Sequence, residues 1–314
     1  MAPGTSIRRK FTGVFYRAAL ASLLALAAGC STVGTSHSKS AAMASAPLPT
    51  YVKGERFITS DGISLRVESV SGNEVEWRYK RHVHLKESRD FIYSTLERKS
   101  RTSTTTRDYS PLNHQALFPL RVGNSAKFTE TTLKVSQKSG TKRGKPRYWI
   151  CEVDGTEKLD LMAGTFDTFR VVCERVHRRH NYKNVVHTYY YAPAVGHVVL
   201  KTIAQKYNKR PDKRIELIGA RPSLAAMGVD AETRQRAYAA FQKVLDGAAS
   251  GATSVWRDPK SGAEVRTVVN GTYQRKDGSY CRRYLQEVTP NLGHRVYPGI
   301  ACRGEDGHWS APSH

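Results

Sequence analysis

Residues 148–175 read YWICEVDGTEKLDLMAGTFDTFRVVCER, and this stretch decides the fold. Apolar and polar residues alternate on both sides of Met162, which is the period typical of β-strands with one buried face. Cys151 and Cys173 are equally distant from Met162 along the chain. Two antiparallel strands around a connection near Met162 would therefore bring the two thiols together. The stretch predicts a pair of antiparallel strands.

The same period of two extends through the sequence on both sides of this stretch. In EVEWRYKRHVHL, residues 74–85, apolar side chains alternate with charged ones. Asp61-Gly62, Gly72-Asn73 and Asp154-Gly155 are expected to form turns between such runs. We therefore expect a mainly β fold (α+β overall), in which residues 51–220 form a curved antiparallel β-rich domain.

The character of the sequence changes near residue 220. Residues 221–229, RPSLAAMGV, are expected to form a linker, and DAETRQRAYAAFQKVLDG that follows has the apolar spacing of a helix. Asp230 suits the N-cap, Gly247 suits the C-terminal end, and Tyr238 belongs to the apolar stripe. Short β-like runs follow, so residues 230–314 are expected to form a small domain with one helix and a small sheet.

Two motifs in this C-terminal part carry a family resemblance. They are Tyr280-Cys281-Arg282 followed by Tyr284, and Ala301-Cys302-Arg303 followed by Asp306-Gly307 and Trp309. With Trp256 and the Pro259/Gly262 turn upstream, they resemble the C-terminal domain of the 17 kDa surface antigen family of bacterial outer-membrane lipoproteins. Many members carry a glycine-zipper segment before this domain. This chain has the β-rich segment there instead, so a membrane-inserting role of such zippers is not carried over.

The N-terminus indicates export. Basic residues between Arg8 and Arg17 precede an apolar run of about half the ~20 residues that a membrane-spanning helix needs. The run ends in LAAGC, which resembles the lipobox of bacterial lipoproteins, in which the cysteine is acylated and becomes the new N-terminus. We expect residues 1–29 to be a signal peptide and Cys30 to carry the lipid anchor. An ordinary signal peptide with an incidental Cys30 is the alternative.

The residues after Cys30 bear on location. Ser31 follows the cysteine. In the lipoproteins that the lipobox resembles, a residue other than aspartate at this position implies sorting to the outer membrane of a Gram-negative bacterium. Residues 30–50 are small, polar and interrupted by proline, so we expect a lipidated, flexible tether whose ends lie about 25 Å apart. The periplasmic or surface side of the membrane and the export route, general secretion or twin-arginine, stay open.

Four cysteines remain after Cys30. An exported protein folds in an oxidising compartment, where an even set of cysteines predicts disulfides. The local pairs are Cys151 with Cys173 and Cys281 with Cys302, and each closes a loop of about twenty residues, worth roughly 3 kcal/mol in the chain-entropy model. Neither pair has the CxxC spacing of zinc or redox sites, so we predict disulfides, no metal site and no cofactor.

Positive charge is concentrated in the β-rich segment. Residues 51–220 contain 32 basic and 18 acidic residues, whereas residues 221–314 contain 13 and 9. A field of this sign attracts polyanions. Native nucleic acid is not expected outside the cytoplasm, which leaves lipopolysaccharide, other anionic envelope polymers and phospholipid headgroups. The candidate anion-binding cluster at an expected hairpin tip is Lys142, Arg143, Lys145 and Arg147, and the alternative is a solvated basic surface.

No motif predicts catalysis, since neither GxSxG nor HExxH occurs. The histidines at 82, 84, 177, 180 and 187 lie among arginines and lysines, and we interpret them as solvated rather than as metal ligands. We therefore expect a non-catalytic, lipid-anchored envelope protein with a structural or interaction role, whose protein partners the sequence does not identify. The alternative is a lipid or lipoprotein handling module that holds an apolar ligand in the curved sheet.

Replacing Cys30 with serine tests the anchor. Without an acylated cysteine the exported chain should move from the membrane fraction to the soluble fraction, because covalent acyl chains supply its membrane affinity. Fractionation and detergent phase separation measure the change. Unchanged membrane partitioning of the Cys30→Ser protein would contradict the assignment.

Overall fold

The computed structural model describes residues 43–176, 183–205, 211–290 and 295–312. Residues 43–314 form one compact unit. Cys30, the predicted signal peptide and residues 30–42 of the predicted tether lie outside the described residues. No helix in the described part of the chain is long and apolar enough to span a membrane.

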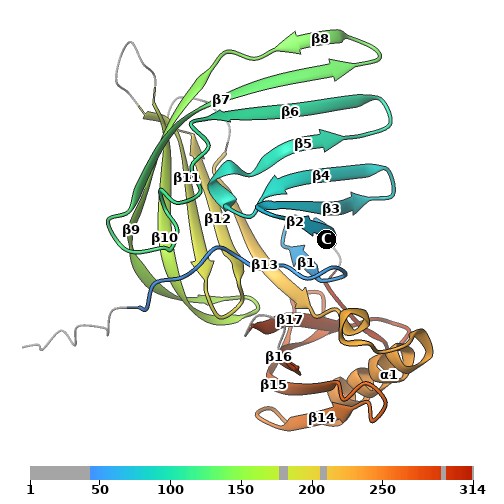
Figure 1. The fold of residues 1–314 in the computed structure, drawn as a ribbon. Helices are drawn as coiled ribbons and strands as arrows, with labels where there is room; N and C mark the ends of the chain where they lie inside the picture. Colours follow the sequence, from blue (N-terminus) through green and yellow to red (C-terminus); the bar gives the residue numbers. More distant parts are fainter. Residues whose placement is uncertain (1–42, 177–182, 206–210, 291–294, 313–314) are drawn as a thin grey trace, which may run out of the picture. The chain divides into compact units, whose positions relative to one another are not determined.

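Twelve antiparallel strands close on themselves into a ring (Figure 1). Their order around the ring is β1 (Arg56–Thr59), β2 (Ser64–Ser71), β3 (Glu74–Lys80), β4 (Val83–Ser88), β5 (Thr95–Lys99), β6 (Ser103–Ser110), β7 (Ser125–Ser136), β9 (Arg147–Leu161), β10 (Gly164–Val176), β11 (Lys183–Ala192), β12 (His197–Gln205) and β13 (Lys213–Arg221). Strand β13 pairs with β1 and closes the ring, and the short β8 (Gly140–Arg143) pairs with β7. The predicted mainly β, antiparallel fold is confirmed. Closure pairs the edges that an open sheet leaves exposed.

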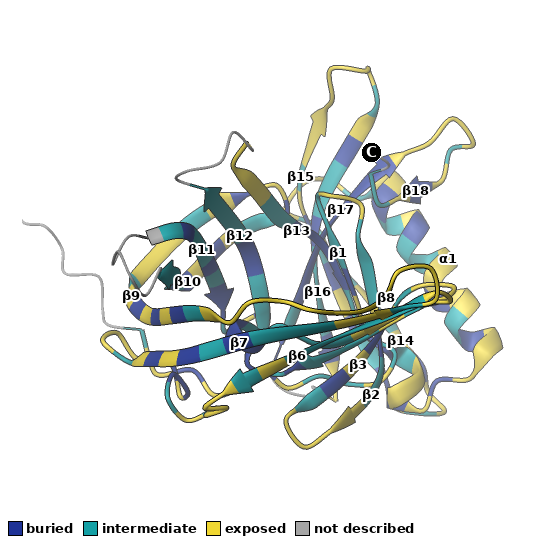
Figure 2. Ribbon diagram, turned by 90° about the horizontal axis from the view of Figure 1, so that it is seen from above, coloured by how far each residue is buried: buried dark blue, intermediate teal, exposed yellow. Residues whose placement is uncertain are grey.

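The stretch from 148 to 175 forms the hairpin of β9 and β10. Leu161 pairs with Gly164 at its turn, and Cys151 lies opposite Cys173, as the sequence predicts. Buried and exposed residues alternate along β9 (Figure 2). Asp154-Gly155 is not a turn, because Val153 and Gly155 pair with adjacent residues of β10 and Asp154 is the extra residue of a β-bulge.

The C-terminal part adds one helix and a meander of strands to the same unit. The elements are η2 (Leu224–Met227), α1 (Ala231–Gly247), β14 (Thr253–Arg257), β15 (Glu264–Gln274), β16 (Tyr280–Thr289), β17 (Val296–Arg303) and β18 (Trp309–Ser310), and η1 (Phe91–Tyr93) lies between β4 and β5. The predicted helix is confirmed: the Asp230 side chain accepts a hydrogen bond of 2.8 Å from the Thr233 backbone N–H. Tyr238 is 48% exposed and does not belong to the buried face of α1.

Helix α1 is fixed to the C-terminal strands by apolar and polar contacts. Leu245 is fully buried in a cluster with Val269 and Tyr284, against which Phe241 packs. The Gln242 side chain donates to the Trp309 carbonyl and accepts from the Trp309 backbone N–H, at 2.9 and 2.8 Å. A buried amide of this kind stabilises only when both its groups are satisfied, as they are here. The polar pair therefore sets the position of β18 on the helix.

The predicted boundary near residue 220 runs through a continuous core. One hydrophobic cluster contains Phe57 and Trp77 of the closed sheet together with Val265 of the C-terminal part. Met227 and Val229, in the predicted linker, are buried in the same cluster. The two segments therefore share a core, and their division into separate domains stays a prediction.

The predicted tether is shorter than expected. Ala46 is 1% exposed, and its backbone exchanges hydrogen bonds of 3.2 and 2.7 Å with Leu120. Met43 and Leu48 pack against the same core. Apolar side chains near the end of the predicted tether bury against the closed sheet, so residues 43–50 belong to the folded unit.

A buried ion pair joins the C-terminal part to β1. Nη2 of Arg295 lies 2.7 Å from Oε1 of Glu55, and both side chains are at most 2% exposed. The Tyr297 hydroxyl donates to the same carboxylate oxygen at 2.8 Å, and the Val52 backbone N–H donates to the other at 2.8 Å. Burial raises the pKa of Glu55, and the Arg295 guanidinium acts in the opposite direction. The carboxylate is thus held by one charge and two neutral donors.

Removing the cation should destabilise the whole unit. Arg295→Met leaves Glu55 buried without its charge partner, which costs about 3–5 kcal/mol of unfolding free energy. Urea unfolding followed by circular dichroism measures the loss. Arg257→Met is the control, because Arg257 pairs with Glu264 at 2.6 Å but is 70% exposed, and such a pair contributes about 1 kcal/mol or less. Equal losses in the two variants would contradict a structural role for the buried pair.

Candidate functional site

Three arginines lie side by side on adjacent strands of the closed sheet. Arg56 of β1 pairs in register with Arg221 of β13 on one side and with Arg66 of β2 on the other. Residues directly opposite each other on antiparallel strands point to the same face, with Cβ atoms about 5 Å apart. We call Arg221, Arg56 and Arg66 the arginine row. Arg78 of β3 pairs with Arg66 and extends the row to a residue already neutralised by Glu68 at 2.9 Å.

The arginine row is a repulsive arrangement that the fold maintains. No ion pair joins these three side chains to a carboxylate among the described residues. Burial lowers the pKa of Arg56, and the charges of Arg221 and Arg66 lower it further. Like charges directly opposite each other on a sheet are destabilising, by about 0.2–1 kcal/mol per pair. A bound anion would relieve this repulsion.

A cleft of about 400 Å³ opens beside the row. Its walls include all three arginines. Its apolar lining includes Tyr238, Ala240, Phe241 and Val244 of α1 with Val255, Trp256 and Val265 of β14 and β15. We call it the helix cleft. Its volume lies within the range of about 300–1,000 Å³ typical of small-molecule sites. The site therefore combines an apolar cleft with a row of cations at one side.

The closed sheet also encloses a cavity, of about 300 Å³, with a charged lining. Its acidic and basic residues are Arg107, Glu130, Arg147, Arg175, His187 and Lys201. Glu130 is satisfied by Arg107 and Arg147, at 3.4 and 3.3 Å, and by the Trp149 indole N–H at 2.9 Å. The apolar-ligand alternative requires a large apolar cavity inside the sheet, and this lining does not provide one.

Two cations, Lys201 and Arg175, line the cavity together with His187. Burial lowers the pKa of this imidazole to about 3, and the charges of Lys201 and Arg175 act in the same direction. The interpretation of His187 as a solvated histidine is therefore wrong, because β11 directs it into the cavity. His82 and His84 are exposed as expected, while His177 and His180 lie outside the described residues.

The predicted anion-binding cluster lies elsewhere than expected. Lys142 and Arg143 belong to β8, and Lys145 lies in the connection to β9, so the cluster is not at the hairpin tip, which residues 137–139 form. All four side chains are exposed, and Arg147 forms an ion pair of 3.3 Å with Glu130. The cluster therefore lies apart from the arginine row, and its anion binding stays a prediction.

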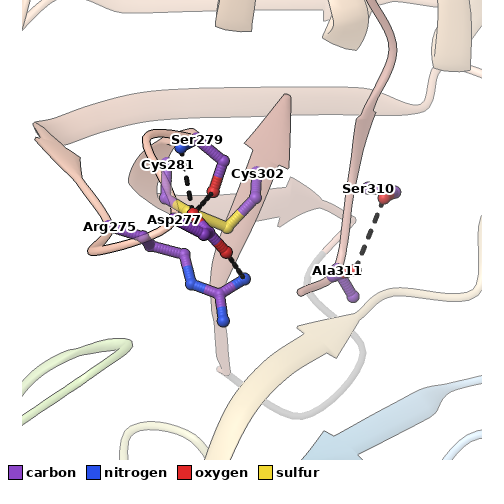
Figure 3. The surroundings of a disulfide bond; sticks show 7 residues. All are labelled: Arg275, Asp277, Ser279, Cys281, Cys302, Ser310 and Ala311. Carbon is purple, nitrogen blue, oxygen red and sulfur yellow. Dashed lines mark hydrogen bonds and ion pairs between the residues drawn. A yellow bond between two sulfur atoms is a disulfide. The ribbon is translucent and has the colours of Figure 1, made fainter. Parts of the chain in front are cut away.

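Both predicted disulfides are present. They join Cys151 to Cys173 and Cys281 to Cys302. Figure 3 shows the second, beside the turn in which Asp277 pairs with Arg275 at 3.5 Å and accepts from the Ser279 hydroxyl at 2.6 Å. In the described part of the chain, no group of three or more histidine, cysteine, aspartate or glutamate residues is placed to hold a metal ion.

The arginine row was not predicted from the sequence. Arg56 and Arg66 lie on consecutive strands of the sequence, β1 and β2. Arg221 lies next to Arg56 only because β13 pairs with β1 where the ring closes. Each arginine occupies an exposed or half-exposed strand position, which by itself is ordinary for a basic surface. Only the register of three strands distinguishes the row from scattered surface charge.

Comparison with known proteins confirms the predicted C-terminal resemblance. Residues 243–310 match the family model of the 17 kDa outer membrane surface antigen. The chain is 37% identical over 82 residues to the 17 kDa surface antigens of Rickettsia conorii and Rickettsia rickettsii, and 34% identical over 82 residues to that of Rickettsia bellii. The matches cover 26% of this chain, which spans about half the length (52%) of these curated relatives.

Two solved structures resemble parts of the fold. The hypothetical lipoprotein YmcC of Escherichia coli aligns over 54% of this chain and 83% of its own, with a TM-score of 0.37 and 10% identity. A putative exported protein with a YmcC-like fold from Bacteroides fragilis aligns over 57% and 100%, with a TM-score of 0.30 and 14% identity.

The field in the interior cavity can be measured at His187. Lys201→Met should raise the pKa of His187 from about 3 toward its ordinary value of 6.5, and only in part, because burial is the larger cause of the depression. Two-dimensional NMR titration of the imidazole measures the pKa.

The direction of the His187 pKa shift also determines how the stability of the fold depends on pH. Because the pKa of His187 is lower in the folded chain than in the unfolded chain, protonation costs stability as pH falls below about 6.5, and Lys201→Met should reduce this loss. Lys127→Met is the control, because Lys127 is exposed and lies outside the cavity lining. A pKa of His187 that Lys201→Met leaves unchanged would contradict the proposed field.

Proposed function

We propose that this chain is a non-catalytic, lipid-anchored protein of the outer membrane that binds anionic envelope lipids through the arginine row. The observation that carries the proposal is the in-register placement of Arg221, Arg56 and Arg66 without a carboxylate partner among the described residues. Guanidinium groups bind phosphate oxygens through paired, charge-assisted hydrogen bonds. Three of them on one face form a surface suited to phosphate-bearing headgroups.

The location rests on two further observations. The lipobox-like LAAGC motif supports an acyl anchor at Cys30, and the C-terminal part resembles proteins named as outer membrane surface antigens. Anchoring keeps the folded unit near a membrane surface, where phosphates are concentrated. The +14 charge of residues 51–220 adds a general attraction to the same surface. The structural or interaction role is thus one exerted at the membrane.

The interior cavity does not suit the apolar ligand of the alternative function suggested by the sequence. Charged residues line it, and an apolar chain would displace water from their polar groups without replacing its hydrogen bonds, which is unfavourable. The lipid-handling alternative inside the closed sheet is therefore the weaker proposal.

Vesicle binding tests the proposal with residues 30–314 carrying Cys30→Ser, so that neither acylation nor the apolar run of the predicted signal peptide contributes. We expect co-sedimentation with phosphatidylglycerol vesicles and none with phosphatidylcholine vesicles, and the binding should weaken as salt shortens the Debye length below about 8 Å. Arg56→Gln with Arg66→Gln should weaken it roughly thirtyfold, at about 1 kcal/mol for each basic residue near an anionic surface.

A second double variant that removes the same charge elsewhere distinguishes binding at the arginine row from general attraction by the positive surface. Lys127 and Lys158 are exposed on β7 and β9 and do not line the helix cleft. Lys127→Gln with Lys158→Gln should change vesicle affinity by less than about threefold, since both lysines lie outside the site. If both double variants lose the same affinity, the positive charge is only a property of the surface and the proposed site is wrong.

A further inference from the structure

The helix cleft leaves apolar side chains uncovered next to charged ones. Tyr238 and Val255, on opposite walls, are 48% and 41% exposed. The floor is well packed: Phe241 and Tyr284 make an edge-to-face contact with ring centroids 4.9 Å apart. The cleft is therefore a hollow with a fixed apolar floor and two partly exposed walls.

The arginine row borders the same cleft, so cationic and apolar side chains lie together in one site. All three arginines of the row line the cleft together with apolar residues of α1, and Arg234 of α1 is a fourth arginine in the lining. A purely ionic ligand would leave the apolar walls exposed to water, and a purely apolar ligand would bury repelling cations without a counter-charge. A molecule with an anionic head and one hydrocarbon chain satisfies both parts of the site.

We infer that the helix cleft binds one acyl chain of a phosphate-headed amphiphile, with the phosphate on the arginine row. The inference rests on the proposed function and specifies its ligand. The head is held by Arg56, Arg66 and Arg221, and the chain lies between α1 and β14–β15. Binding at this site places one hydrocarbon chain in the protein, whereas adsorption to a charged surface places none.

The first test is the dependence of affinity on chain length. Residues 30–314 carrying Cys30→Ser are titrated calorimetrically with octyl, decyl and dodecyl phosphate below their micelle concentrations. Each added pair of methylenes should tighten binding about tenfold until the cleft is full, because every methylene transferred from water into the cleft adds to the binding free energy. A nonionic dodecyl maltoside should bind far more weakly, because the arginine row then lacks its counter-charge.

The second test fills the cleft. Ala240 lines the cleft from α1, and Ala239, its neighbour on the helix, is exposed and does not line it. Ala240→Phe should weaken dodecyl phosphate binding at least tenfold, whereas Ala239→Phe should leave it within twofold. Thermal melting shows whether either variant has lost its fold, and the chain-length series on the unsubstituted cleft does not depend on the variants.

The outcomes separate the inference from the proposed function. If phosphatidylglycerol vesicles are bound through the arginine row but affinity for alkyl phosphates is the same at every chain length, the acyl site is wrong and the proposed function stands. If neither vesicles nor alkyl phosphates bind, both are wrong. Chain-length dependence that survives Ala240→Phe would place the hydrocarbon elsewhere and overturn the inference.

Discussion

The buried ion pair between Glu55 and Arg295 is the contact on which the arrangement of the unit depends. Burying two charges is unfavourable unless each finds its partner and its remaining donors or acceptors are satisfied, so the geometry around the pair tolerates little displacement. The carboxylate meets this condition through Arg295, Tyr297 and Val52. Glu55 precedes Arg56, and Tyr297 lies on β17, which contacts β13 beside Arg221. The pair thereby holds Arg56 close to β17, which is connected through β16 to β15, one of the strands that line the helix cleft.

The features that the sequence predicts are those that short stretches determine. The hairpin of residues 148–175 follows from its alternation and from the symmetry of the two cysteines about Met162, and both are local properties. Helix α1 is predicted because Asp230 caps it and apolar residues recur at helical spacing. The disulfides follow from the compartment and from sequence proximity. In each case the partners are close in the chain, so the register hardly depends on the rest of the molecule.

The features that the sequence misses depend on pairing between distant strands. Closure of β13 on β1 creates the arginine row, and no local pattern relates Arg221 to Arg56. His187 is polar, yet its side chain lies inside the ring, because the cavity there accommodates polar and charged groups that a fully packed core excludes. Residues 221–229 contain Pro222 and Gly228 and read as a linker, but Met227 and Val229 complete a core whose other side chains come from both segments.

The distance along the chain between Glu55 and Tyr297 has a kinetic consequence. The hydrogen bond joins positions 242 residues apart, and bringing such positions together loses chain entropy before any contact compensates. Native topologies rich in such contacts fold slowly, since local hairpins form long before the ends meet. Strand β1 is synthesised before the other strands of the ring, but the carboxylate of Glu55, the residue before it, acquires its buried partners only when Arg295 and Tyr297 have been made. Until those residues pack against the ring, the Glu55 carboxylate lacks its ion-pair partner and one of its hydrogen-bond donors.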